Sequence, residues 1–258
     1  MQAAQVIHDF LDRLNHSSAS VLLLDYDGTL APFQTDRHHA YPYPGVVTIL
    51  NRIMHSGKTR VVIISGRPVH ELQALIHPLS NLEIWGAHGQ EHLLADGTYR
   101  LNALDPAIVE SLKQMETHLN TTGLSSTIET KPGGIAIHWR GLPSSEMQKV
   151  QQLAQQELEP LVQRPGFKLL SFDGGVEIRA AHPDKGDAVS AILKESAPDT
   201  PIAFLGDDLT DEDAFRVLNG HGLSILVRKE YRKTEAQAWL RPPQELIDFL
   251  GTWLNRSI

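Results

Sequence analysis

The chain has 258 residues, of which 41% are hydrophobic and 21% charged, as in a globular protein of one large or two smaller domains. Its formal net charge of -8, with Lys and Arg scattered along the chain, argues against a nucleic-acid partner. The absence of cysteine excludes disulfides and thiol nucleophiles and fits a reducing compartment, so we expect a cytoplasmic protein. Because no signal peptide and no apolar run of about 18 residues is evident, no membrane association is expected.

Short apolar runs alternate with helical patterns along much of the chain. Helical spacing in VIHDFLDRL predicts a first helix that ends near Leu14. The runs VLLLD, TRVVIIS and PIAFLGDD then indicate strands buried on both faces, and VVTILNRIMHSG and DAVSAILKES indicate helices between them. The pattern predicts an α/β fold with a Rossmann-like, doubly wound parallel sheet, which binds ligands at the carboxyl ends of its strands.

The middle of the chain has a different pattern. Two helical stretches, PAIVESLKQMETHL and SSEMQKVQQLAQQELEPLV, alternate with two hairpin-like pairs, STIETK with IAIHWR and FKLLSF with VEIRA, the second pair turning at Asp173. This pattern predicts a four-stranded α+β module at 105–183, inserted into a core made of 1–104 and 184–258. The tail, WLRPPQELIDFLGTWL, predicts a closing helix.

Acidic residues follow two of the predicted strands. Asp25 and Asp27 stand two apart at the end of VLLLD, so we expect them to face one small volume while Tyr26 points away. Gly28 would permit the sharp exit turn. Two carboxylates that share a site repel each other unless one is protonated or a cation lies between them. The run GDDLTDED adds further acids, among them Asp207 and Asp208, and this oxygen-rich set favours Mg²⁺.

Candidates to bind an anion occur after another strand and before a helix. Lys185, in HPDKGDAV, precedes a predicted helix whose amino end also attracts anions. Ser65 and Arg67, in IISGRP, could hold a phosphoryl oxygen by a hydroxyl, turn amides and a positive charge. Carboxylates, Mg²⁺, Lys and a hydroxyl around one phosphate make a phosphoryl-transfer site.

Four motifs in order, DYDGT, IISGR, the lysine of DKGDA and GDDLTDED, resemble those of the haloacid dehalogenase superfamily of phosphotransferases. An insertion between the second and third motifs implies, in that superfamily, a cap domain that closes over the sugar end of a substrate. GAHGQEH, ETKPGGIAIHWR, GGVEIRAAHPDKGDA and FLGDDLTDEDAF further resemble the trehalose-6-phosphate phosphatase family. The segment TDRHHAYPYPG matches no family role.

The resemblance implies a Mg²⁺-dependent phosphatase that hydrolyses trehalose 6-phosphate through an aspartyl-phosphate. Asp25 would be the nucleophile and Asp27 the acid and base. Thr29, Ser65 and Lys185 would bind the phosphoryl group. Mg²⁺ would be held by Asp25, the backbone carbonyl of Asp27 and Asp207, with Asp208 or Asp211 orienting the shell, and we expect Asp208 in the metal set.

The cap would bind the sugar through polar side chains on one sheet face. Glu129 and Lys131 lie two apart on one predicted strand, and Glu177 on another could share their face. The resemblance implies sugar contacts by these three and by Arg179, and places Arg67, His88 and Glu91 along the cleft.

The expected partner is a small phosphosugar, with functional coupling to a trehalose-6-phosphate synthase. The alternatives are a phosphatase for sucrose or mannosylglycerate phosphates, a phosphosugar mutase, and a non-catalytic phosphosugar sensor.

Overall fold

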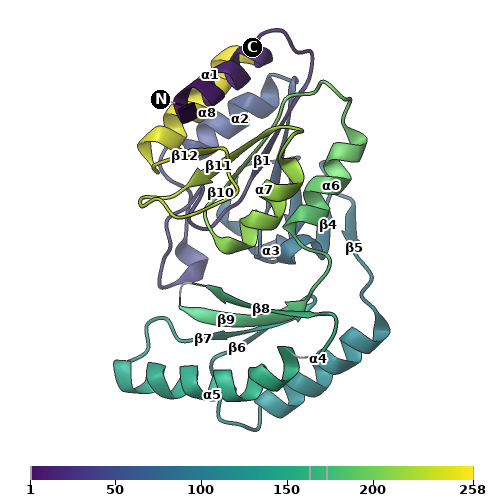
Figure 1. Ribbon diagram of the computed structural model, residues 1–258, viewed down its shortest axis with the longest axis vertical. Coiled ribbons are helices and arrows are strands. Elements are labelled where there is room, and N and C mark those ends of the chain that lie inside the picture. Colours follow the sequence, from purple (N-terminus) through teal and green to yellow (C-terminus); the bar gives the residue numbers. More distant parts are fainter. Residues whose placement is uncertain (1, 163, 173, 258) are drawn as a thin grey trace. The chain divides into compact units, whose positions relative to one another are not determined.

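The computed structural model describes residues 2–162, 164–172 and 174–257, and the chain divides into two compact units. The larger unit comprises Met1–Arg100 and Asp184–Ile258, and the smaller comprises Leu101–Pro183 (Figure 1). Asp173, in the turn of the second predicted hairpin, lies outside the described residues.

The larger unit is built on an eight-stranded sheet in the order β12-β11-β10-β1-β2-β3-β4-β5. Neighbouring strands from β12 to β3 are parallel, and β4 runs antiparallel to β3. The strand bounds are β1 Ser20–Leu24, β2 Thr59–Ile64, β3 Glu83–Gly86, β4 Glu91–Leu93, β5 Tyr99–Leu101, β10 Ile202–Gly206, β11 Leu223–Val227 and β12 Ala238–Leu240. The predicted α/β fold with a parallel sheet is therefore confirmed, and β4 and β5 extend it in a way that the sequence pattern did not predict.

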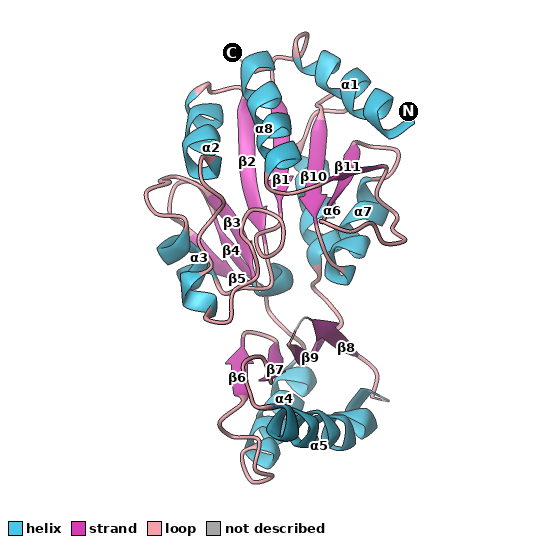
Figure 2. Cartoon of the chain, turned by 90° about the vertical axis from the view of Figure 1, so that its left-hand side faces the viewer, coloured by secondary structure: helices cyan, strands magenta, loops and turns pink. Residues whose placement is uncertain are grey.

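Helices cover both faces of this sheet (Figure 2). Apolar side chains of α1, α2, α3 and α8 pack on one face, and those of α6 and α7 pack on the other. Their bounds are α1 Gln2–Leu14, α2 Val46–His55, α3 Val69–Leu75, α6 Lys185–Glu195, α7 Glu212–Leu218 and α8 Gln244–Arg256. Three short 3-10 helices, η1 Arg37–His39, η2 Ala87–Gly89 and η3 Leu209–Asp211, lie in the connections.

The burial of β1 on both faces explains why its sequence is continuously apolar. Leu22 and Leu24 belong to the core on one face, whereas Val21 and Leu23 belong to the core on the other. A strand buried on both faces has no solvated side to alternate with. Its neighbours are β2 and β10, so the chain builds the sheet outward from β1 first in one direction and later in the other. β1 thus lies at the topological switch point, where open α/β sheets bind ligands.

The smaller unit is a four-stranded antiparallel sheet in the order β6-β7-β9-β8, covered by two helices. Its elements are α4 Pro106–Leu119, β6 Ile128–Lys131, β7 Gly134–His138, α5 Ser144–Val162, β8 Phe167–Phe172 and β9 Gly175–Ala180. Ile135, Ile137 and Ile178 pack with Met115, Leu119 and Leu158 of the helices. Among the described residues of the whole chain, no helix has the length and apolarity that crossing a membrane would take.

A buried carboxylate joins β3 to β4 in the larger unit. Glu83 accepts hydrogen bonds from Arg60 Nε at 2.7 Å and Nη2 at 2.8 Å, and its Oε1 lies 2.8 Å from His92 Nε2. Burial alone would raise the pKa of Glu83, but His92 and Arg60 outweigh burial and lower that pKa to about 2. The charged form of Glu83 is therefore favoured by the fold.

Because the folded pKa of Glu83 is depressed, its contribution to stability is present above the unfolded value of 4.5 and is lost as pH falls toward about 2. We expect Glu83→Gln to lower the free energy of unfolding at pH 7 by up to about 3 kcal/mol, with the difference from wild type shrinking between about pH 5 and 2. Urea unfolding of both proteins at several pH values measures this. A difference that does not depend on pH would contradict it.

Candidate active site

Asp25 follows the last residue of β1, and both of its carboxylate oxygens accept hydrogen bonds. Its backbone N–H donates to Leu205 O of β10 at 2.8 Å, which continues the sheet one residue beyond the strand. Lys185 Nζ donates to Oδ1 at 2.6 Å, and Thr29 Oγ1 donates to Oδ2 at 3.0 Å. Asp25, Thr29 and Lys185 are all buried. The predicted nucleophile therefore lies at the carboxyl end of the central strand, in contact with two of the predicted phosphoryl-binding residues.

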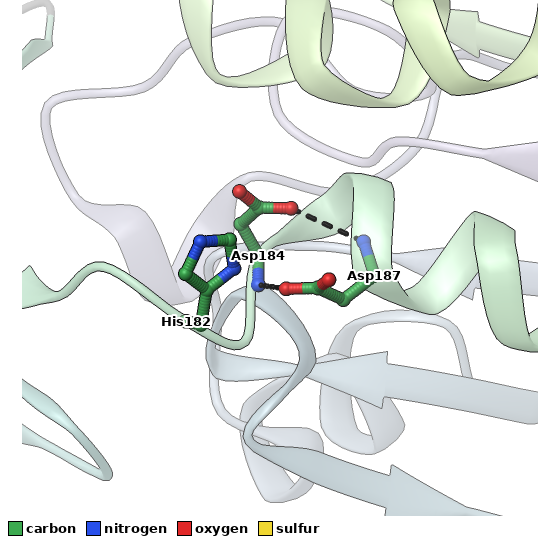
Figure 3. Close-up of side chains that lie close together, drawn as sticks. All are labelled: His182, Asp184 and Asp187. Carbon is green, nitrogen blue, oxygen red and sulfur yellow. Dashed lines mark hydrogen bonds between the residues drawn. The ribbon is translucent and has the colours of Figure 1, made fainter.

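Lys185 is held by the start of α6. Asp184 and Asp187 form a capping box there: Asp187 N donates to Asp184 Oδ1 at 3.1 Å, and Asp184 N donates to Asp187 Oδ2 at 2.9 Å (Figure 3). Such a box satisfies amide groups that the first helical turn leaves without a partner. Lys185 is the first residue of the helix, so the box fixes the point from which its ammonium reaches Asp25.

A second carboxylate, that of Asp211, shares this ammonium. Lys185 Nζ donates to Asp211 Oδ1 at 2.6 Å, while Asp211 Oδ2 accepts the backbone N–H groups of Asp207 and Asp208 at 3.0 Å each. Asp25, Asp207 and Asp211 are buried, and each offers one oxygen within 4.8 Å of the others. Lys185 thus binds two of the three clustered carboxylates. Arg228, which is half exposed, lies 3.9 Å from Asp207 Oδ2.

The pKa values of these groups reflect the shortage of positive charge. Burial, opposed by Lys185 and reinforced by Asp211, raises the pKa of Asp25 to about 7. Burial and the neighbouring carboxylates, first among them Asp25, raise the pKa of Asp207 well above its ordinary value. Burial alone would lower the pKa of Lys185, but Asp211 and Asp25 outweigh it and raise that pKa. A divalent cation beside these oxygens would supply the missing charge.

Gly28 is required by the way the chain leaves this cluster. Its φ is 81°, in the left-handed region, and a Cβ placed on it would lie 2.1 Å from Asp207 Oδ2. The glycine therefore permits both the sharp turn after β1 and the approach of Asp207 to Asp25.

Asp27, the second predicted catalytic acid, follows Asp25 two residues later and is bound by Arg67. Arg67 Nε and Nη2 donate to its two oxygens at 2.6 and 2.7 Å, and its carboxylate is not among the three that cluster. The strand ends at Leu24, and the chain then turns to form an isolated bridge from Asp27 to Ala31. Tyr26 is directed into the core, as expected, and its hydroxyl donates to Ala40 O at 2.7 Å.

Asp208, which we expected in the metal set, caps the turn η3. Its carboxylate accepts the Leu209 N–H at 2.8 Å and forms a capping box with Asp211 at the start of η3. The three-residue spacing of a 3-10 turn returns Asp211 to the cluster and leaves Asp208 outside it. The structure therefore favours Asp211 as the third carboxylate. The end of the predicted strand was sufficient to place Asp207 at the site. It did not show whether Asp208 or Asp211 would join the carboxylate cluster.

Ser65 follows β2, and its loop is bound by the segment after β3. Its hydroxyl accepts the Arg67 N–H at 3.2 Å, and its carbonyl accepts the His88 N–H at 2.9 Å. Ala87 and His88 both have positive φ, 46° and 57°, which costs non-glycine residues about 1 kcal/mol or more each. Two strained residues at this position are typical of a functional site.

Glu91, expected along the cleft, has both carboxylate oxygens committed within the larger unit. Its Oε2 accepts the N–H of Val69, the first residue of α3, at 2.8 Å, and its Oε1 accepts the Tyr99 hydroxyl at 2.8 Å. We therefore interpret Glu91 as a residue that holds the start of α3 after the Ser65 loop.

The four predicted sugar contacts share one face of the smaller unit's sheet. Register pairs Glu129 with Ala136 and Ala136 with Glu177, and it pairs Lys131 with Gly134 and Gly134 with Arg179. The expectation that Glu129, Lys131 and Glu177 lie on a common face is confirmed. Lys131 Nζ donates to Glu177 Oε2 at 3.0 Å across Gly134, where a Cβ would lie 2.9 Å from Glu177 Oε1. His138 Nε2 lies 2.7 Å from Glu129 Oε2, and Arg179 donates to Pro183 O at 2.9 Å.

A family model described as trehalose-phosphatase matches residues 23–243. The chain belongs to the trehalose-phosphatase family. It is 30% identical over 246 residues to a trehalose-phosphate phosphatase of Mycobacterium ulcerans, covering 89% of this chain and 60% of that protein. A probable trehalose-phosphate phosphatase of Oryza sativa is 29% identical, with 89% of this chain and 64% of the relative covered. The chain thus spans less than two thirds of the length of these trehalose-phosphatase relatives.

The fold is also similar to that of a solved structure, the C-terminal domain of Candida albicans trehalose-6-phosphate phosphatase. The TM-score is 0.80 at 21% identity, and 96% of each chain is covered. At this identity the likeness supports the fold, and the family membership rests on the sequence match.

Two glycines with similar backbone angles test the constraint at Gly28. Gly57 has φ 76° and nothing within 4 Å of a Cβ placed on it, whereas Gly28 would meet Asp207. We expect Gly57→Ala to cost about 1–2 kcal/mol of unfolding free energy and Gly28→Ala at least about 3 kcal/mol, because the clash adds to the backbone strain. Urea unfolding at pH 7 measures both, and equal losses would contradict the account.

Proposed function

We propose that this protein hydrolyses trehalose 6-phosphate to trehalose and inorganic phosphate, with Asp25 as nucleophile. The observation that carries the proposal is the buried contact of Lys185 with Asp25 and Asp211, beside Asp207, in a chain of the trehalose-phosphatase family. A carboxylate can attack phosphorus without a base to activate it, and an ammonium at 2.6 Å can neutralise an oxygen of the phosphoryl group that arrives.

Mg²⁺ fits the donor set of this site. The three clustered carboxylates offer hard oxygen ligands, and the Lys185 ammonium binds only two of them. Asp25, Asp207 and Asp211, with the backbone carbonyl of Asp27, would hold the ion. Bound Mg²⁺ would supply positive charge to the phosphoryl oxygens and lower the cost of ionising all three acids together.

The two chemical steps fall to the protein's own side chains. Asp25 attacks phosphorus to form an aspartyl-phosphate as the bond from phosphorus to the sugar oxygen breaks, and Asp27, which must be in its neutral, protonated form at this step, donates its proton to that oxygen. Asp27 then accepts a proton from the water that attacks the aspartyl-phosphate, which releases phosphate and restores Asp25. Thr29, Ser65 and Lys185 hold the phosphoryl oxygens. Arg67, which binds Asp27, sets the position of the acid.

The charged sheet face of the smaller unit would recognise the sugar. Trehalose presents hydroxyl groups and no charge beyond its phosphate, so its recognition requires several fixed donors and acceptors. Glu129, Lys131, Glu177 and Arg179 supply such groups on one face, and we propose that 101–183 acts as the sugar-recognition domain. His88 remains a candidate from the core. A synthase that makes trehalose 6-phosphate would be the enzyme's functional neighbour.

The proposed chemistry is tested by phosphate release from trehalose 6-phosphate, sucrose 6-phosphate, mannosylglycerate phosphate and glucose 6-phosphate, with Mg²⁺ or with chelator. We expect strong preference for trehalose 6-phosphate, no turnover with chelator, and a loss of at least about 1,000-fold in Asp25→Asn. Asp96→Asn, which changes an exposed turn acid, is the control and should match wild type. Full activity of Asp25→Asn would contradict the covalent mechanism, and equal rates on glucose 6-phosphate would contradict the specificity.

The sugar-recognition role is tested by two Glu–His pairs of the smaller unit. We expect Glu129→Ala to raise KM for trehalose 6-phosphate about 10-fold, because one hydrogen bond to a charged group is lost. The rate of p-nitrophenyl phosphate hydrolysis should stay within about twofold of wild type. Glu157→Ala removes the Glu157–His118 pair on the helices, 2.6 Å long, and should change neither substrate. Equal effects of Glu129→Ala on both substrates would count against sugar recognition.

A further inference from the structure

The segment TDRHHA, to which the sequence resemblance gave no role, is bound on two sides by residues next to the proposed acid Asp27. Its centre, Arg37–His39, forms the turn η1. The hydroxyl of Tyr26 donates to Ala40 O at 2.7 Å, and Arg67 Nη1 donates to Arg37 O at 2.8 Å. The residue before Asp27 and the arginine that binds Asp27 therefore both hold this turn.

Glu71, in the first turn of α3, joins the turn to Arg67 by side chains as well. Its Oε2 accepts Arg37 Nη2 at 2.7 Å and Arg67 Nη1 at 3.3 Å. The side chains of Glu71 and Arg67 are only 11% and 7% exposed, so this ion pair is screened less than a surface pair. Charges alternate along the row Asp27, Arg67, Glu71, Arg37, and one carboxylate separates the two guanidinium groups.

The orientation of the Arg67 guanidinium links this row of charges to the position of the Asp27 carboxylate. One edge of its planar guanidinium, Nε and Nη2, binds both oxygens of Asp27, and such a fork fixes direction as well as distance. Its remaining nitrogen, Nη1, is held by Glu71 and by Arg37 O. Without the Glu71 carboxylate, Arg67 would lose one anchor and would face Arg37 with no intervening negative charge. The position of Asp27 therefore depends on Glu71, which does not touch it.

We propose that Glu71 is a positioning residue for the reaction, and that the η1 turn, through Arg37, completes the arrangement that aims Asp27 at the leaving oxygen. This inference rests on the proposed function. Glu71 acts through Arg67 and makes no contact with the reacting atoms. Its loss displaces the proton donor and leaves the nucleophile in place, because none of the Asp25 hydrogen bonds described above involves Glu71, Arg67 or Arg37.

Leaving groups of different acidity distinguish this role from a purely structural one. A sugar alkoxide must receive a proton as it leaves, whereas p-nitrophenolate leaves without one. A misplaced Asp27 should therefore slow attack on trehalose 6-phosphate and spare the first step with p-nitrophenyl phosphate. General loss of structure would slow both.

The experiment measures single-turnover cleavage of both esters with Mg²⁺ in wild type, Glu71→Gln and Glu195→Gln. Glu195 pairs with Arg60 at 2.8 Å near the amino end of β2, whereas the proposed site lies at the carboxyl ends of the strands. Glu195→Gln therefore controls for the loss of a carboxylate that binds an arginine. We expect Glu71→Gln to slow trehalose 6-phosphate cleavage about 10-fold. The rate of p-nitrophenolate release should stay within about twofold of wild type. Glu195→Gln should match wild type on both.

Equal slowing of both esters in Glu71→Gln, or no slowing of either, would overturn the inference. A wild type inactive on both esters would overturn the proposed function and this inference with it.

Arg37→Met tests the same row whether or not Glu71→Gln folds, and it does so from the partly exposed end of the row. It should slow trehalose 6-phosphate cleavage about threefold and leave the rate of p-nitrophenolate release unchanged. The double variant Glu71→Gln, Arg37→Met should be no slower than Glu71→Gln alone, because both changes act on one row. Fully additive losses, or an Arg37→Met variant equal to wild type, would overturn the inference.

Discussion

The contact of the Lys185 ammonium with Asp25 and Asp211, 2.6 Å to each, is the interaction on which the rest of the site depends. All three groups are buried, and buried charges are tolerated only when they are paired and hydrogen-bonded. Ionising Asp25, Asp207 and Asp211 together is costly without further positive charge, which is why the pKa values of Asp25 and Asp207 are raised. That cost is what makes a divalent cation, and then an anionic phosphoryl group bound to it, physically reasonable there.

Sheet topology brings these groups together from distant parts of the chain. Asp25 and Lys185 are 160 positions apart, and 101–183 intervenes between them as a separate compact unit. β1 and β10 are neighbours at the switch point, so Asp25 and Asp207 follow the carboxyl ends of adjacent strands. The capping box of Asp184 and Asp187 then starts α6 with Lys185 directed at Asp25 and Asp211. The sheet thus supplies the arrangement, and the caps fix individual side chains.

The sequence predicted the features that follow from strand burial and period. Continuous apolar runs located β1, β2 and β10, and alternation located the shared face of Glu129, Lys131 and Glu177. Features that depend on turns were not predictable. Asp27 lies past the end of β1 and is held there by Arg67, and Asp211, one of the two acids considered for the metal shell, joins the carboxylate cluster because a 3-10 turn sets the spacing. The contacts of Arg228 and Arg232 with Asp207 O, and of Glu71 with Arg37, join segments that no local pattern relates.

Calorimetric titration of Mg²⁺ at pH 6.5, in two buffers of different ionisation enthalpy, measures whether the cluster of Asp25, Asp207 and Asp211 binds a divalent cation and releases protons as it does so. With the pKa of Asp25 raised to about 7 by burial, part of the metal-free protein carries a proton there that the ion must displace. We expect one Mg²⁺ per chain, release of protons on binding at pH 6.5, and loss of binding in Asp207→Asn. Absence of Mg²⁺ binding at millimolar concentrations, or equal affinity in Asp207→Asn, would contradict it.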